Sequence, residues 1–94
     1  MAKLFDLTIV TPDEVVYEGK ASSLVAPCAL GYLGVLGDHA PLIANMKAGK
    51  ITLKEESGKS LFFDSTSNGF LQVLKNNVTI ILSKDISYVR LRRT

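Results

Sequence analysis

The sequence has few of the residues that build chemical sites. Its 94 residues include one histidine, His39, one cysteine, Cys28, and no tryptophan. A zinc site needs three or four nitrogen, sulfur or oxygen ligands, and a calcium or magnesium site needs clustered carboxylates. The carboxylates Glu55 and Glu56 lie together in a stretch that is typical of a solvated hairpin loop. We therefore expect no metal and no cofactor.

The sequence also lacks the patterns of a disulfide framework, a secretory signal and a membrane span. Cys28 has no second cysteine to pair with, and Asp6 interrupts the start of the chain where a signal peptide would be apolar. The longest apolar run is about five residues, against the ~20 that a membrane-spanning helix needs. These absences predict a soluble protein in a reducing compartment.

The sequence has no large excess of positive or negative charge. The formal net charge is +2, so nothing demands a polyanionic partner. The only basic cluster is Arg90, Arg92 and Arg93 at the end of the chain. We expect this cluster to be a solvated tail, with a contact to an acidic partner or to lipid headgroups as the alternative.

What is present is a hydrophobic fraction of 47% arranged with a period of two. This predicts one domain, residues 1–94, with a core over about 4–85 and a short basic tail over 86–94. Strands are expected in the β-rich runs, and turns at the proline, glycine and asparagine signals between them. The nearest candidate for a helix, 41–47, is too short because it lies between Pro41 and Gly49. The spacing indicates an all-β sandwich or barrel. The expected strands are 4–10, 15–18, 21–26, 51–54, 61–63, 70–74 and 78–82, with turns at 11–14, Gly19, Pro27, 55–59 and Asn76-Asn77.

The middle of the chain is rich in glycine. Gly31, Gly34 and Gly37 recur at every third position, and Asp38 to Leu42 follow directly. Such a density indicates backbone in positive φ or in close approach to other atoms, and we expect a shaped loop region here. A phosphate-binding loop is not favoured, because no helix and no lysine follow the glycines.

Two other functions remain as alternatives, a hydrolase and a nucleic-acid-binding module. A hydrolase would use His39 as its base, with Ser65, Ser67 or Cys28 as nucleophile, yet none of these stands in a nucleophile motif. A nucleic-acid-binding β module would need exposed aromatic side chains beside a basic groove. The phenylalanines at 5, 62, 63 and 70 fall on strands, where burial is the simpler explanation. The other interpretations of His39 are a turn residue that bonds nearby backbone and a partner-contact residue on a rigid loop. The partner contact fits the glycine-rich setting better than catalysis does.

The chain resembles the epsilon subunit of F-type ATP synthases, which is called delta in mitochondria. The most specific match is Gly31-x-Leu33-Gly34-Val35-Leu36-x-x-His39-Ala40-Pro41-Leu42. The resemblance begins in Leu7 to Pro12 and covers nearly the whole chain to about residue 85. Its other segments are 16–19, 25–27, Lys47-x-Gly49, 67–73 and 77–80.

This resemblance implies a flattened β-sandwich of about ten short strands and a non-catalytic rotor subunit. Such a subunit joins the gamma subunit to the membrane c-ring in the central stalk during proton- or sodium-driven ATP synthesis. It is peripheral, on the cytoplasmic face of an inner or other energy-transducing membrane. The resemblance assigns to the c-ring-facing loop Cys28, Ala29, Leu30, Gly31 and Tyr32, and to the gamma-facing surface His39, Pro41, Leu42, Ser67, Asn68 and Gly69.

Three departures from the family pattern matter. Many members have an acidic residue where Tyr32 stands. Here either the c-ring contact is apolar and hydrogen-bonded through Tyr32, or this loop does not make the family's contact. The family's double glycine is replaced by Asn68-Gly69, which costs little because asparagine tolerates positive φ. The helical hairpin that ends typical members is missing, by nature or by truncation. We therefore expect no ATP binding and no hairpin-type inhibition.

Overall fold

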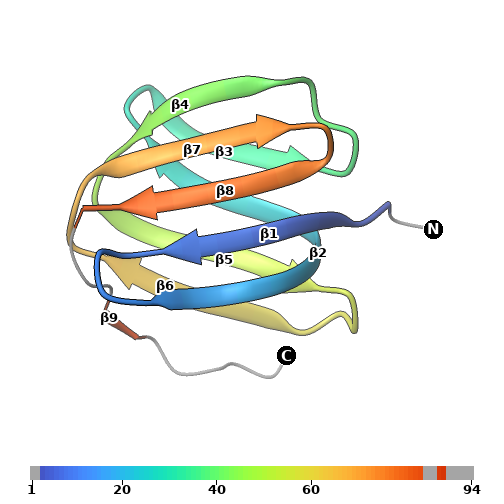
Figure 1. Ribbon diagram of the computed structural model, residues 1–94, viewed down its shortest axis with the longest axis horizontal. Coiled ribbons are helices and arrows are strands. Elements are labelled where there is room, and N and C mark those ends of the chain that lie inside the picture. The colour runs from blue at the N-terminus through green and yellow to red at the C-terminus, as the bar shows by residue number, and fades with distance from the viewer. Residues whose placement is uncertain (1–2, 84–86, 89–94) are drawn as a thin grey trace.

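The structure is a computed structural model that describes residues 3–83 and, by their backbone alone, residues 87–88. It is all-β: nine strands are described, and no helix occurs in the described ranges (Figure 1). This confirms the expected all-β class and comes close to the expected number of strands. The strands are β1 (Phe5–Val10), β2 (Val15–Cys28), β3 (Gly31–Leu36), β4 (Leu42–Met46), β5 (Gly49–Glu55), β6 (Ser60–Ser65), β7 (Gly69–Leu74), β8 (Asn77–Leu82) and β9 (Ser87–Tyr88).

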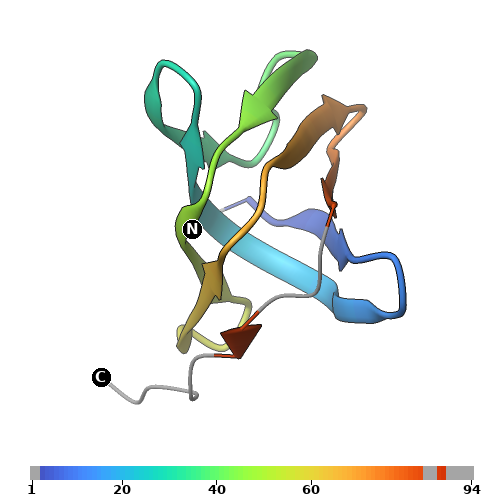
Figure 2. The same cartoon turned by 90° about the vertical axis from the view of Figure 1, so that its left-hand side faces the viewer.

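The long strand β2 joins the two layers of the sandwich. Its first half pairs with β1, and its second half pairs with β3 and β5. The register against β5 shifts between Ala21 and Ser23, and such a bulge bends the strand from one layer into the other. In Figure 2 this strand, in light blue, runs diagonally across the molecule. One layer therefore follows the order β4-β7-β8-β1, and the other contains β3, β5, β6 and β9.

The alternating apolar residues form the core between the layers. In β1, Phe5, Leu7 and Ile9 are buried, whereas Asp6 is exposed. The same alternation in β7 and β8 buries Leu71, Val73, Val78, Ile80 and Leu82. Each large side chain that is fully buried contributes about 1.5–3 kcal/mol of transfer free energy. The period of two in the sequence is therefore the period of burial in the fold.

Glycine and proline led to wrong strand boundaries in the first third of the chain. Separate strands at 15–18 and 21–26 were expected, but Gly19 pairs with Leu7 inside an unbroken β2, and Pro27 pairs with Tyr32 near its end. The glycine-rich region is also not a loop, because 31–36 form β3 against β2. The pairing with neighbouring strands outweighs the weak breaking tendency of a single glycine, and a proline is tolerated near a strand end.

Two further expectations need adjustment. Residues 42–46 form β4, which pairs with β7. The β7–β8 turn lies one residue earlier than expected, because Lys75 and Asn76, with φ of 50° and 61°, take the left-handed conformation of a two-residue hairpin turn. The hairpin between β5 and β6 lies where the sequence predicts it. Arg90, Arg92 and Arg93 lie outside the described residues, so the expected solvated tail stays a prediction.

Candidate partner-binding surfaces

The tip between β2 and β3 carries the residues expected to face the c-ring. Leu30 is fully exposed and Tyr32 is largely exposed, whereas Cys28 is buried. Gly31 has a φ of 124°, which explains the need for glycine at this turn. The Ala29 amide donates a hydrogen bond of 2.9 Å to the Asn45 carbonyl, so the tip is held against β4. The tip therefore presents Leu30 and Tyr32 from a fixed backbone.

The loop between β3 and β4 carries His39 and Pro41. Its backbone is held by the Asp38 amide, which donates to Asn76 Oδ1 at 2.8 Å, and by the His39 amide, which donates to the Leu36 carbonyl at 3.2 Å. Asp38 forms an ion pair with Lys3 at 2.9 Å. His39 Nδ1 lies 2.8 Å from the carbonyl of Ala40 and is placed to donate to it. His39 therefore acts here as a loop residue that bonds nearby backbone.

The turn before β7 is held by side-chain and backbone hydrogen bonds. Ser67 is buried, and the Ser65 hydroxyl donates to the Ser67 carbonyl at 3.0 Å. The Asn68 carbonyl accepts from both the amide and the hydroxyl of Ser83, each at 3.0 Å. A Cβ on Gly69 would collide with the Ile81 carbonyl oxygen. Glycine is therefore required at 69 by the close approach of β8.

The six residues expected on a gamma-facing surface fall into two groups. In the β4–β7 ladder Leu42 pairs with Val73 and Met46 with Gly69, so the His39 loop and the Ser67 turn lie at opposite ends. Four residues along a strand correspond to about 13 Å. Asn68 and Gly69 instead share a depression of about 350 Å³ with Ala29 of the β2–β3 tip.

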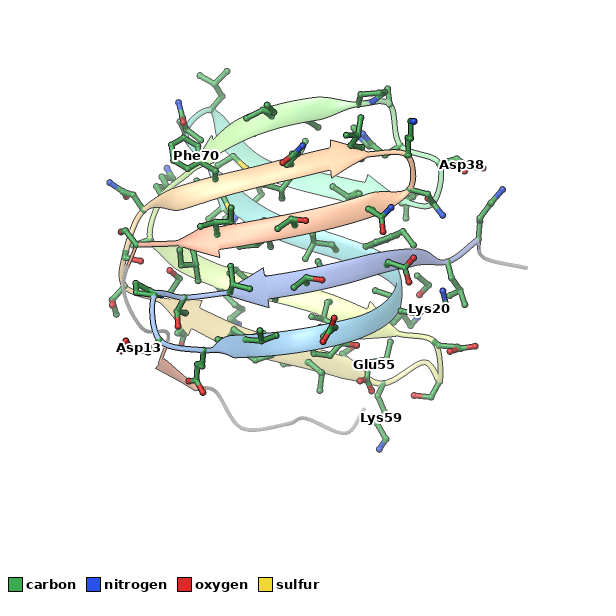
Figure 3. All side chains as sticks on the ribbon, in the orientation of Figure 1. Asp13, Lys20, Asp38, Glu55, Lys59 and Phe70 are labelled. Atoms are coloured by element: carbon green, nitrogen blue, oxygen red, sulfur yellow. The ribbon has the colours of Figure 1, made fainter. Side chains whose placement is uncertain are left out.

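An exposed apolar face was not found by sequence reasoning. Phe70, expected to be buried, is 55% exposed, and Ile43 and Ile81 are 72% and 49% exposed. Figure 3 shows Phe70 and Asp38 near opposite ends of the molecule. The register aligns Phe70 with Ile81, then with Val10 and Val15, across β7, β8, β1 and β2. We call Ile43, Phe70, Ile81, Val10 and Val15 the outer-face patch.

A sequence signal for this patch exists. Strands with one wet face alternate apolar and polar residues, but Ile80-Ile81-Leu82 and Leu42-Ile43 are apolar at consecutive positions. Neighbouring residues of a strand point to opposite faces, so at least one apolar residue in each of these runs must face away from the core. Contiguous apolar surface of this kind marks interaction sites in soluble proteins.

The described residues offer little for chemistry. No group of three or more potential metal ligands occurs among residues 3–83. Burial raises the pKa of the Cys28 thiol, which lowers the fraction of reactive thiolate. Burial, and then the charge of Glu55 and a hydrogen bond to its carboxylate at 3.3 Å, raise the pKa of Tyr17 to about 12. In the same part of the chain, no helix has the length and apolar character of a membrane span.

Comparison with known proteins assigns this architecture to a class. The sequence model of the family described as ATP synthase, Delta/Epsilon chain, beta-sandwich domain matches residues 4–87, and the chain belongs to this family. Among curated relatives, it is 40% identical over 81 residues to an ATP synthase epsilon chain of Desulforamulus reducens, covering 86% of this chain and 60% of that protein. It is 38% identical over 85 residues to one of Chlorobium limicola, covering 90% of this chain and 94% of that one. The chain spans about 60% of the length of the relatives that match it first.

Solved structures share the fold. A chain of the Euglena gracilis mitochondrial ATP synthase, solved as OSCP/F1/c-ring in rotational state 1, superposes with a TM-score of 0.79 at 21% identity, over 87% of this chain and 51% of that chain. A chain of the Tetrahymena thermophila mitochondrial ATP synthase central stalk and c-ring gives a TM-score of 0.72 at 18% identity, over 93% and 68%. At these identities the likeness supports the β-sandwich fold.

Proposed function

We propose that this chain is a non-catalytic rotor subunit of an F-type ATP synthase, which joins the gamma subunit to the c-ring in the central stalk. The observation that carries the proposal is an exposed apolar patch on a rigid β-sandwich of the delta/epsilon family. A coupling element needs preformed contact surfaces, because rigid elements lose little entropy when they dock. The subunit acts at a membrane through its complex, on the cytoplasmic face.

The outer-face patch is the better candidate for the gamma-facing surface. Phe70 and Ile81 are paired neighbours on it, and Ile43 is diagonal to Phe70 in the β4–β7 register. Aromatic and large aliphatic side chains at the centre of an interface carry most of the binding energy. Ser67 is buried and Gly69 has no side chain, so the polar Asn68 is the accessible side chain of that turn and supplies no comparable apolar contact. His39, Pro41 and Leu42 remain candidates for a separate contact at the other end.

The tip with Leu30 and Tyr32 is the candidate for the c-ring-facing loop. Both side chains are exposed, and the backbone of the tip is held to β4 through Asn45. It has no charge, so its contact with the ring depends on apolar burial and on the Tyr32 hydroxyl. Such a contact is expected to be only weakly sensitive to salt, unlike an ion pair.

The geometry around His39 supports a role without catalysis. A triad-like base is oriented by a carboxylate and lies within hydrogen-bond reach of a nucleophile. Here the Asp38 carboxylate pairs with Lys3, and His39 Nδ1 faces the Ala40 carbonyl. Ser65 and Cys28 lie toward the other end of the sandwich, beyond the β4–β7 ladder.

A binding measurement tests the proposal. The purified chain is titrated with the gamma subunit from the same organism, beside a Phe70→Asp variant and a Ser57→Lys control in the exposed β5–β6 hairpin. We expect the native chain and the control to bind, and Phe70→Asp to weaken binding at least about tenfold, which corresponds to about 1.4 kcal/mol. A folded native chain that does not bind the gamma subunit would overturn the proposal.

A further inference from the structure

β3 is paired along one edge only, as far as the chain is described. Residues 31–36 pair with 23–28 of β2, and β3 has no second strand partner in residues 3–83. An unpaired edge presents a row of backbone donors and acceptors in the geometry of an extended chain. The segment that matches such an edge is another strand.

An apolar groove runs beside this edge. It has a volume of about 420 Å³ and lies between the β2–β3 hairpin on one side and β4 on the other. Figure 1 shows β3 and β4 at the same end of the molecule. β4 pairs along its length with β7, but its register with β2 is limited to Met46 and Cys28. The backbone hydrogen bonds of Ala29 to Asn45 and of Lys47 to Pro27 lie at this same end. Beyond it, no strand pairing joins β3 to β4 in residues 3–83. Leu33 and Leu42 line the groove and pack against the core while remaining partly accessible.

The edge lacks the usual protection of exposed strands. Natural edge strands carry charges, proline or bulges that prevent pairing with other chains. No charged residue occurs in 21–37 or 40–46, which include all of β3 and β4. The β3 edge therefore has the chemistry of an edge that is covered in an assembly by an uncharged segment.

We propose that an extended, uncharged segment of the gamma subunit adds to β3 as a strand and places apolar side chains in the groove. This inference rests on the proposed function, because it takes its partner from there. Ile43 connects the two surfaces: it lines the groove and also belongs to the outer-face patch. A partner that covers Ile43 therefore borders both the patch and the groove, whose other wall is the β2–β3 tip.

Amide hydrogen exchange tests the inference on the full chain labelled with ¹⁵N, free and bound to the gamma subunit. We expect several amides of 31–36 to exchange at least about tenfold more slowly in the complex, because strand addition gives them hydrogen-bond partners. A complex that forms with no change in β3 exchange would overturn the strand addition but leave the proposed function standing. Failure to form a complex would overturn both.

A charge placed on the edge provides the matched variant. Gly34→Lys puts the added side chain where a Cβ meets no atom within 4 Å, so folding is preserved. Ser57→Lys makes the same change of charge in the β5–β6 hairpin. We expect Gly34→Lys alone to weaken binding to the gamma subunit, by about tenfold. Equal binding by both variants would contradict the inference. So would a free chain that forms a dimer in which the β3 amides are already protected from exchange, because a second copy would then cover this edge.

Discussion

Asn76 Oδ1 accepts a hydrogen bond of 2.8 Å from the Asp38 amide, and this contact ties the β7–β8 turn to the β3–β4 loop. The same side chain donates through Nδ2 to the Leu4 carbonyl at 2.7 Å. One asparagine thus joins three segments that are distant in sequence. It closes one end of the sandwich, whereas the edge between β3 and β4 stays open. This clamp fixes the position of the β3–β4 loop relative to the β7–β8 turn.

Replacement of Asn76 should show how much the clamp contributes. Asn76→Ala loses both side-chain hydrogen bonds. It also replaces asparagine, which tolerates a φ of 61°, with alanine, which does so at a higher cost. We expect the free energy of unfolding to fall by about 2–4 kcal/mol, measured by urea denaturation. Asn76→Gly keeps the backbone conformation and should lose only about 1–2 kcal/mol. Equal losses in both variants would show that φ is not a factor.

Gly69 should tolerate no side chain. A Cβ at this position meets the Ile81 backbone carbonyl, which cannot move without disturbing β8. We expect Gly69→Ala to lower the free energy of unfolding by about 2–4 kcal/mol. Gly34→Ala is the control, because no atom lies within 4 Å of its Cβ position, and its stability should be unchanged or slightly higher. A stable Gly69→Ala protein would argue against the close approach of β7 and β8.

The pKa of Tyr17 predicts a loss of stability in alkali. Folding raises this pKa from 10.0 to about 12, so the folded state favours the neutral phenol. The resulting stabilisation is complete below about pH 10 and is lost as the pH rises from about 10 to about 12. In urea denaturation over this range, the native chain should lose more stability than Tyr17→Phe, which has no phenol to titrate. Parallel losses in the two proteins would contradict the shift.

The alternation of apolar residues made β1, β7, β8 and the β5–β6 hairpin predictable. The full extent of β2 and the strand β3 were not predictable in this way. Gly19, Pro27 and the glycines of 31–37 disfavour a strand locally, but pairing with strands elsewhere in the chain outweighs that tendency. The exposure of Phe70 depends on which face of β7 meets the core. Phe70 shares a face of β7 with Gln72, whereas Leu71 and Val73 point into the core, so the alternation within this strand already indicates that Phe70 is exposed.

The family resemblance predicted which segments matter, and the structure shows which side chains in them are accessible. Ser67 and Cys28 belong to the expected contact segments, yet both are buried. Leu30 in the tip is exposed, as a contact residue must be. Side-chain exposure is a property of the packed sandwich, so motif matching alone could not separate these cases.

Reconstitution tests the central claim most directly. Membrane vesicles whose ATP synthase has been depleted of this subunit are supplied with the native chain, with Phe70→Asp or with the Ser57→Lys control. ATP synthesis under an imposed ion gradient is then measured. We predict that the native chain and the control restore synthesis, and that Phe70→Asp restores much less. A folded native chain that binds to the depleted complex and restores no synthesis would contradict the coupling role.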